Sequence, residues 1–348
     1  MTTIDDVRER LAEIRPAGLS RDLIAAGLVR EVTLRDGVAM VQLLPGPLPP
    51  PILAATIADI KRVVGALPEV VGVDVQIARP SEQAQAAIPG VADIVAVAST
   101  KGGVGKSTVA VNLACALTRR GLRVGLLDAD IYGPSLPTML AIAGRPRVEQ
   151  TTVYPLEAHG LKVMSMGFFL DDTSPVIWRG PLVTGLLRQF LKDVRWGELD
   201  LLIVDMPPGT GDAALTLAQQ VPLSGVVVVT TPQPVSVIDV ERGIAMFNQV
   251  NTPVLGVVEN MSGYVCPHCG RLDEVFGAGG AVHLEQTYGL PILARIPLDA
   301  AVRTGGDAGV PIVVAQPEHP ISRLYAAMAE QVCEGIEAAR TAAPRIVG

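Results

Sequence analysis

The stretch Asp93-Ile-Val-Ala-Val-Ala-Ser-Thr-Lys-Gly-Gly-Val-Gly-Lys-Ser-Thr108 decides the fold of this chain. An apolar run of strand length leads into a glycine-rich turn, and apolar side chains at helical spacing follow the turn. This order of strand, loop and helix is the context that a phosphate-binding loop requires. Successive backbone N–H groups of such a loop can face one point, and the positive end of the following helix adds to their attraction for anions. The stretch therefore predicts a site for a polyphosphate.

Two lysines in this loop have different expected roles. Lys106 would reach the β and γ phosphates of a nucleotide, and Ser107 would ligate Mg²⁺. The loop departs from the plain pattern, because Thr100 stands where the first glycine would be and Lys101 adds a second positive charge. Lys101 is therefore either a residue with a role of its own or a solvated loop lysine. The residues expected to hold the nucleotide are Gly102, Gly103, Val104, Gly105, Lys106, Ser107 and Thr108.

Length and composition limit the possible classes of protein. With 348 residues, the chain has room for a second module beside one average domain. The chain is 49% hydrophobic but only 3% aromatic, which is typical of parallel sheets covered on both faces. The net charge of −7 gives no general attraction to nucleic acid or anionic lipid, and no apolar run approaches the roughly 20 residues of a membrane span. We expect no nucleic-acid partner and no membrane partner.

Two features indicate the compartment. The segment Met1-Thr-Thr-Ile-Asp-Asp-Val-Arg8 is acidic and lacks the apolar region of a secretory signal. Four cysteines in a chain of this size do not form a disulfide framework. We therefore expect a reducing compartment, most simply the cytoplasm.

Residues 1–80 have the pattern of a small α+β domain. An amphipathic segment begins at Ile4, and two strand patterns joined by Arg35-Asp-Gly37 have hairpin-turn chemistry. A helix is expected from Pro51 to about Ala66, followed by one more strand. The arrangement resembles the small iron-sulfur-assembly domain, but no cysteine precedes Cys115, so this domain cannot ligate iron through thiolates. We interpret it as a docking or regulatory domain.

The rest of the chain has the pattern of a single α/β domain. Residues 81–90 have linker composition, residues 91–340 alternate apolar runs with helical segments, and residues 341–348 form a tail. The alternation predicts a mostly parallel sheet flanked by helices and joined by right-handed crossovers. Ligands of such a sheet lie at the carboxyl ends of its strands, which is where Lys106, Asp128 and Asp205 fall.

Three carboxylates follow apolar strands. Asp128 and Asp130 flank one alanine, and such a pair would be costly at a strand end without a cation or an ordered water molecule. Asp205 ends the run Leu201-Leu-Ile-Val204, where it can bond the water shell of a magnesium ion. Gly209 supplies a hinge whose N–H can sense a γ-phosphate. The sequence therefore predicts a magnesium-dependent ATPase.

Recognition of the base is assigned to two further strand ends. Asn260 has donor and acceptor groups suited to an adenine edge, although it could instead cap a turn. Pro297 follows another strand and could lie against the adenine ring. Both residues are therefore candidate nucleotide contacts.

The motif Cys266-Pro-His-Cys269 presents two thiolates to one metal. Structural zinc prefers four ligands, and Cys115 and Cys333 lie in segments with ordinary helical core spacing. Two ligands per chain are half a site, and a homodimer would supply the four thiolates of a bridging 4Fe-4S cluster. Zinc held between two chains and a thioredoxin-type redox dithiol remain open. His268 is either a further ligand or a solvent-facing residue of the turn.

The glycine loop Lys101-Gly-Gly-Val-Gly-Lys-Ser-Thr108 resembles the deviant phosphate loop of ParA/MinD-type ATPases. That resemblance implies a homodimer in which Lys101 reaches the partner's nucleotide. Over residues 91–340 the chain also resembles the Mrp/ApbC-type iron-sulfur cluster carrier ATPases. The motifs that carry this second resemblance are Asp128-Ala-Asp-Ile-Tyr-Gly-Pro-Ser135, Trp178-Arg-Gly-Pro181, Asp205-Met-Pro-Pro-Gly-Thr-Gly-Asp212, Glu259-Asn-Met261 and Cys266-Pro-His-Cys269.

The resemblance implies roles for individual residues. Lys101, Lys106 and Asp130 would be catalytic, with Asp130 orienting the attacking water, while Asp128 would join Ser107 and Asp205 in the magnesium site. Cys266 and Cys269 would hold the cluster.

The implied function is a homodimeric, cytoplasmic ATPase that carries a labile 4Fe-4S cluster from an assembly scaffold to apo iron-sulfur proteins. Hydrolysis should be slow without a partner. The alternatives are a ParA/MinD-type partitioning or positioning ATPase, which leaves the cysteines unexplained, and a cluster-bridged electron-transfer ATPase, whose cluster would stay in place.

Overall fold

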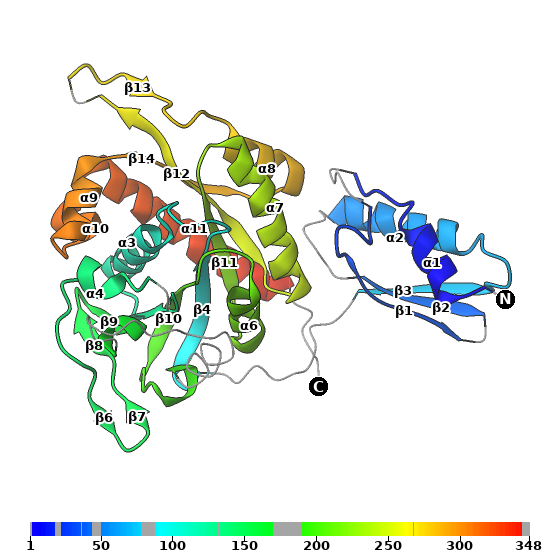
Figure 1. The fold of residues 1–348 in the computed structure, drawn as a ribbon, viewed down its shortest axis with the longest axis horizontal. Coiled ribbons are helices and arrows are strands. Elements are labelled where there is room, and N and C mark those ends of the chain that lie inside the picture. The colour runs from blue at the N-terminus through cyan, green and yellow to red at the C-terminus, as the bar shows by residue number, and fades with distance from the viewer. Residues whose placement is uncertain are drawn as a thin grey trace.

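The computed structural model describes residues 2–17, 22–35, 37–43, 50–77, 88–130, 133–169, 190–266 and 268–342. Figure 1 shows a small N-terminal unit beside a larger α/β unit. Each unit buries its own cluster of apolar side chains, from Val7 to Val64 in the small unit and from Ile88 to Ile336 in the large one. The two clusters have no residue in common. Ile88 is only 4% exposed, so packing of the large unit begins shortly before the expected start at Val91.

In its described residues, the small unit is a three-stranded sheet with two helices. Its strands follow the order β1-β2-β3, with β1 antiparallel to β2 and β2 parallel to β3. Thr3 caps the first helix through a capping box with Asp6, which satisfies backbone N–H groups that have no partner within the helix. The elements are α1 (Ile4–Leu11), β1 (Val29–Arg35), β2 (Val38–Leu43), α2 (Pro50–Val64) and β3 (Gly72–Ile77). The predicted hairpin and helix are therefore present.

The large unit is built on a nine-stranded sheet in the part of the chain that the structure describes. Its order is β13-β12-β11-β4-β10-β5-β9-β8, and β14 pairs with β12. The central strands are parallel, and only β13 and β8 run antiparallel to their neighbours. The strands of this sheet are β4 (Val91–Ala98), β5 (Val124–Asp128), β8 (Leu156–Ala158), β9 (Leu161–Ser165), β10 (Leu199–Asp205), β11 (Gly225–Thr230), β12 (Val254–Val265), β13 (Leu272–Asp273) and β14 (Ile292–Leu298). This is the predicted fold class.

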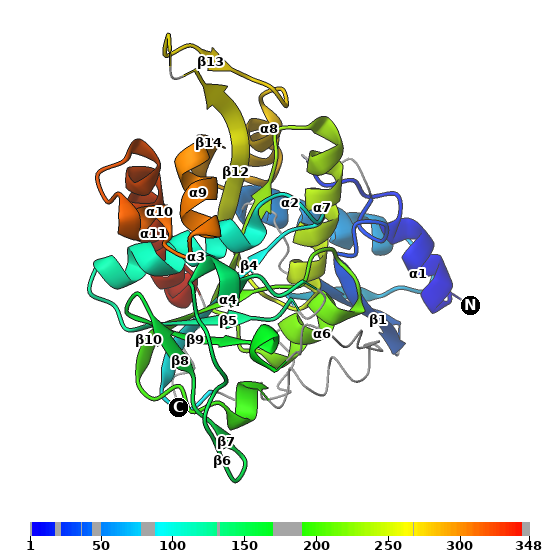
Figure 2. The same cartoon turned by 60° about the vertical axis from the view of Figure 1, so that its left-hand side comes forward.

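Helices cover both faces of this sheet (Figure 2). The helix after the glycine loop, α3, packs against the C-terminal helix α11, and α7 packs between α6 and α8. None of the described helices is both long enough and apolar enough to cross a bilayer. The helices are α3 (Lys106–Arg119), α4 (Leu136–Met139), α6 (Asp212–Gln220), α7 (Pro234–Gln249), α8 (Gly280–Tyr288), α9 (Ala300–Asp307), α10 (Ile312–Ala315) and α11 (Pro320–Ala342), with the 3₁₀ turn η1 (Met166–Phe168) and the short pair β6 (Val148–Glu149) and β7 (Thr152–Val153).

The register of the central strands positions the predicted acidic residues. Asp205 on β10 lies opposite Asp128 on β5 and opposite Val97 on β4. Parallel strands end at the same edge of the sheet, so both carboxylates meet the loop that follows β4. The sequence predicted these strand ends correctly, because apolar runs of this length are buried on both faces of a parallel sheet.

One strand is longer than its sequence pattern suggests. Glu259, Asn260 and Met261 were expected to follow a strand, but they lie inside β12, which continues to Val265. The extension carries the chain out of the core, because its buried residues give way to exposed ones at Tyr264 and Val265. The motif Trp178-Arg-Gly-Pro181 lies outside the described residues.

Candidate functional site

The glycine loop is shaped by close packing on one side and open space on the other. Gly105 has φ 82° and is the N-cap residue of α3, and a Cβ there would lie 2.2 Å from Nδ2 of Asn260. A side chain larger than hydrogen would therefore be both strained and blocked. Cβ atoms at Gly102 and Gly103 would meet no heavy atom within 4 Å among the described residues beyond their chain neighbours. The open side of the loop has the room that a phosphate group requires.

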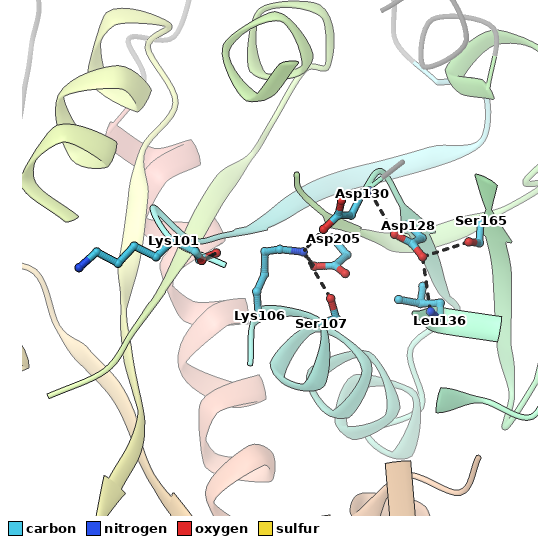
Figure 3. A network of polar contacts seen from close by, with 9 residues as sticks. Lys101, Lys106, Ser107, Asp128, Asp130, Leu136, Ser165 and Asp205 are labelled. Carbon is cyan, nitrogen blue, oxygen red and sulfur yellow. Dashed lines mark hydrogen bonds and ion pairs between the residues drawn. The ribbon is translucent and has the colours of Figure 1, made fainter. Parts of the chain in front are cut away.

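Lys106 lies among carboxylates at the start of α3 (Figure 3). Its Nζ is 2.6 Å from Oδ1 of Asp205 and 3.9 Å from Oδ2 of Asp130. Nζ also donates to Oγ of Ser107 at 3.4 Å. Lys106 is 6% exposed and Asp205 is fully buried. Burial raises the pKa of Asp205, and the positive charge of Lys106 opposes that rise.

Asp128 holds the loop that carries Asp130. Its Oδ1 accepts from the backbone N–H of Asp130 at 3.1 Å, and its Oδ2 accepts from Oγ of Ser165 at 3.0 Å and from the N–H of Leu136 at 3.4 Å. Burial and, after it, the neighbouring charge of Asp205 raise the pKa of Asp128 to about 7, against the lowering by the hydrogen bonds from Ser165 and Asp130. The side chain of Asp128 therefore joins the end of β5 to β9 and to the start of α4.

Three oxygen atoms at this site are buried without a hydrogen-bond partner in the described part of the chain. They are Oδ1 of Asp130, Oδ2 of Asp205 and Oγ of Ser135. Buried polar atoms are normally satisfied, so unpaired oxygens point to a missing partner. Hard oxygen donors suit Mg²⁺ and its water shell. The carboxylate oxygens of Asp130 and Asp205 therefore fit magnesium. Ser135, to which the sequence assigned no role, directly precedes Leu136, whose N–H donates to Asp128.

Lys101 turns away from this cluster (Figure 3). Its Nζ is 3.0 Å from Oδ2 of Asp239 on α7, and the two side chains are 34% and 22% exposed. Oδ1 of Asp239 also accepts from Nη1 of Arg242 at 3.0 Å. In this conformation Lys101 forms an ion pair within its own chain. No sequence pattern singled out Asp239, because it lies on a helix more than a hundred residues from the loop.

Asn260 reaches the glycine loop from β12. Its Nδ2 donates to the carbonyl oxygen of Val104 at 2.7 Å, and the residue is 8% exposed. The amide therefore supports the loop backbone in this structure, and its contact with adenine stays a prediction. Pro297 follows Ile296 on β14, and Ile296 pairs with Asn260. The two predicted base contacts thus lie on neighbouring strands.

The hairpin of β12 and β13 projects from the large unit, as Figures 1 and 2 show from two directions. The two cysteines lie in the turn between these strands. The N–H of Cys266 donates to the carbonyl of Arg271 at 2.9 Å, and the N–H of Gly270 donates back to the carbonyl of Cys266 at 2.8 Å. Cys266 is half-buried and Cys269 is exposed. Backbone hydrogen bonds from His268 and then Cys269 lower the pKa of Cys266. The turn therefore favours a thiolate at this position.

The hairpin lacks a complete set of metal ligands. Among the described residues, no group of three or more His, Cys, Asp or Glu side chains could hold a metal ion. Cys115 is buried in the core, where burial raises its pKa to about 12, and Cys333 is half-buried on α11. Cys115 therefore has the expected core position, and Cys333 lies in the C-terminal helix as the sequence indicates.

The parallel sheet, the glycine loop before α3 and the buried pair of Lys106 and Asp205 define a P-loop NTPase of the MinD/ParA type. A family model described as NUBPL iron-transfer P-loop NTPase matches residues 90–333. A second model, described as iron-sulfur cluster assembly protein, matches residues 4–75. The chain therefore belongs to the family of NUBPL iron-transfer P-loop NTPases, which confirms the predicted family.

Relatives of known description cover most of the chain. It is 44% identical over 344 residues to an iron-sulfur cluster carrier protein from Synechocystis, with 95% of this chain and 97% of that one covered. It is 49% identical over 253 residues to an iron-sulfur protein required for NADH dehydrogenase in Arabidopsis thaliana mitochondria, covering 72% of this chain and 81% of that one.

A solved structure supports the nucleotide site. The nucleotide-binding protein from Archaeoglobus fulgidus in complex with ADP has 40% sequence identity and a TM-score of 0.59, and the match covers 66% of this chain and 90% of that one. The cell division ATPase MinD from Pyrococcus furiosus has a TM-score of 0.53 at 24% identity over 70% of this chain and 98% of its own, which shows a shared fold.

Proposed function

We propose that this protein hydrolyses ATP and carries a labile 4Fe-4S cluster, which it binds between two copies of the chain and transfers to apoproteins. The observation that carries the proposal is the pair Cys266 and Cys269 on a projecting hairpin of a P-loop NTPase. The relatives named as iron-sulfur cluster carriers support it.

The cluster is the cargo of this protein, and the cysteines determine its stoichiometry. A 4Fe-4S cluster is held by four thiolates, and the hairpin offers two. In the described part of one chain, the two thiols are not part of any group of three or more His, Cys, Asp or Glu side chains that could hold a metal ion. A second copy supplies the missing pair, so the cargo would bridge a homodimer.

The residues of the nucleotide site would have different roles in hydrolysis. The backbone from Gly102 to Thr108 would hold the phosphates, with Lys106 on the β and γ groups and Asn260 and Pro297 beside the base. Ser107, Asp128 and Asp205 would hold Mg²⁺ and its water shell, and the metal would supply charge stabilisation to the phosphates. Asp130 would orient the attacking water, because its Oδ1 is buried at the site without a partner among the described residues.

Hydrolysis should be slow in a single copy. Lys101 is held by Asp239 of its own chain, so the catalytic set is incomplete until this lysine is released. Release of Lys101 toward the nucleotide of a second copy would complete the set and change the geometry of the dimer. The N-terminal domain, residues 1–80, would serve as a docking site for an assembly scaffold or for acceptor apoproteins, in the cytoplasm.

Anaerobic reconstitution with iron and sulfide tests the cargo assignment. Wild type should take up a 4Fe-4S cluster, with the absorbance of a bridged cluster and a mass of two chains. The variant Cys266→Ala/Cys269→Ala should remain colourless, whereas Cys333→Ala, which changes a thiol on α11, should load like wild type. Full loading of the double variant would overturn the proposal.

Two further measurements separate the alternatives. Loss of the cluster to apo-aconitase, with recovery of aconitase activity, is expected of a carrier and not of an electron-transfer ATPase. Zinc bound between two chains would give the same dimer without iron and without colour, which metal analysis of anaerobically purified protein would detect.

A further inference from the structure

Large apolar side chains are exposed along the hairpin that carries the cysteines. Of the eleven exposed large hydrophobic residues in the described part of the chain, four lie between positions 264 and 275. They are Tyr264 at 41%, Val265 at 46%, Leu272 at 52% and Val275 at 55% exposed. Such a concentration on one small element is unusual for a surface without a partner.

Two of these residues form a pair. Val265 on β12 lies opposite Leu272 on β13, so their side chains share one face of the hairpin. Both residues of β13 are exposed, and a two-stranded hairpin is marginally stable unless its apolar face is covered. A Cβ at Gly263 would lie 2.7 Å from Cδ1 of Leu272, so Leu272 packs over bare backbone while the rest of its surface faces outward.

The Val265–Leu272 pair lies next to the cysteines, which favours a second copy of this chain as its partner. Val265 precedes Cys266, and consecutive Cα atoms are about 3.8 Å apart. If two chains share one cluster, their hairpins must approach until four thiolates reach the same few atoms. Val265 directly precedes a ligand residue, so the end of each hairpin that carries the Val265–Leu272 pair would then lie at the contact between the two copies.

The charges of the hairpin agree with contact between two copies. Arg271, Asp273 and Glu274 are all exposed on this short segment. Both signs of charge therefore occur on one surface, and a twofold arrangement can place the arginine of one copy near the acids of the other. A partner of strong single-sign charge would leave one of these groups facing a like charge.

We infer that Val265 and Leu272 form an apolar contact between two copies of this chain, which closes the hairpin over the bridging cluster and limits its exposure to water and chelators. This inference rests on the proposed function. Val265 and Leu272 do not ligate the cluster, but they would control how long the dimer retains it.

The test substitutes each residue and measures cargo retention. Val265→Thr keeps the shape of valine and adds one hydroxyl, and Leu272→Asn makes the opposite strand polar. Val148→Asn is the matched control, because Val148 is a valine 52% exposed on the two-stranded pair of β6 and β7, far from the cysteines in the sequence. Val265→Ile is the conservative variant.

After reconstitution, iron per chain, sedimentation and the rate of iron loss to a chelator are measured. Val265→Thr and Leu272→Asn should lower occupancy and speed the loss of iron by roughly tenfold, since each dimer loses two apolar contacts. Val148→Asn and Val265→Ile should behave like wild type. ADP binding should be unchanged in all four variants, which verifies that the ATPase unit is folded.

The outcomes separate this inference from the proposed function. If Val265→Thr and Leu272→Asn retain iron and self-associate like wild type, while Cys266→Ala/Cys269→Ala does not load, the contact between copies is wrong and the carrier function stands. If the cysteine double variant loads fully, the proposed function fails whatever the apolar variants do.

Discussion

The ammonium group of Lys101 lies 3.0 Å from the carboxylate of Asp239, a residue on the helix that follows β11. The pair is partly exposed, and such ion pairs contribute about 0–1 kcal/mol to stability. A contact of this strength holds the lysine in place but can be exchanged for a phosphate at little cost. The pair therefore marks a resting position of Lys101.

Substitution at Lys101 should affect hydrolysis more than nucleotide binding. Lys101→Ala should lower the rate of ATP hydrolysis at least about tenfold, because a group that stabilises developing phosphate charge is lost. Affinity for ADP should stay nearly unchanged, because Lys101 points away from the glycine loop. Steady-state hydrolysis and titration calorimetry measure the two effects, and an equal loss of both would contradict this division.

Removal of Asp239 should free the lysine without damage to the fold. Asp239→Asn should change the free energy of unfolding by less than about 1 kcal/mol and should not lower the rate of hydrolysis, since Lys101 is then free to reach a nucleotide. Asp307→Asn is a matched control, because Asp307 pairs with Arg303 on α9 at 2.6 Å and has no connection to the glycine loop. Urea unfolding of both variants, followed by circular dichroism, measures the change.

The buried pair of Lys106 and Asp205 should show strong coupling in a double-mutant cycle. Lys106→Ala should abolish nucleotide binding and destabilise the nucleotide-free protein by about 3–5 kcal/mol, because it leaves a buried carboxylate without its partner. Lys106→Ala/Asp205→Asn should recover much of the lost stability but none of the nucleotide binding. Additive losses in urea unfolding would show that the 2.6 Å contact does not couple the two residues.

One variant can distinguish the two roles considered for Asn260, which are support of the glycine loop and contact with adenine. Asn260→Ala removes the hydrogen bond to Val104 and should weaken ADP binding about tenfold by loosening the glycine loop. If Asn260 also contacts adenine, the preference for ATP over GTP should fall in the same variant. Equal losses for both nucleotides would restrict Asn260 to supporting the loop.

Alkylation should distinguish the cysteines of the metal-free protein. Backbone hydrogen bonds lower the pKa of Cys266, so its thiolate is present at lower pH than an unperturbed thiol. Burial raises the pKa of Cys333 and raises that of Cys115 to about 12. Iodoacetamide at pH 7 should therefore modify Cys266 first and Cys115 last, as mass spectrometry would detect. Modification of Cys333 as fast as Cys266 would contradict the prediction.

The nucleotide site could be predicted largely from the sequence, because its parts are local. The glycine loop needs residues that accept positive φ, and Gly105 has φ 82°. Asp128 and Asp205 end apolar strands, and the ends of parallel strands meet at one edge of a sheet. The order of apolar runs, glycines and acids was therefore sufficient to predict the fold class and the place of these residues.

Only the tertiary structure decided the contacts between distant segments. Asp239 pairs with Lys101 across 138 positions, Asn260 supports Val104 from another strand, and Val265 meets Leu272 only because β12 continues outward as a hairpin. None of these contacts follows from spacing along the chain, because each depends on how strands and helices pack. The sequence by itself determined which chemical groups are present and which strand ends bring them together. The packing of the chain decided that Lys101 pairs with Asp239 and that Val265 and Leu272 lie beside the cysteines.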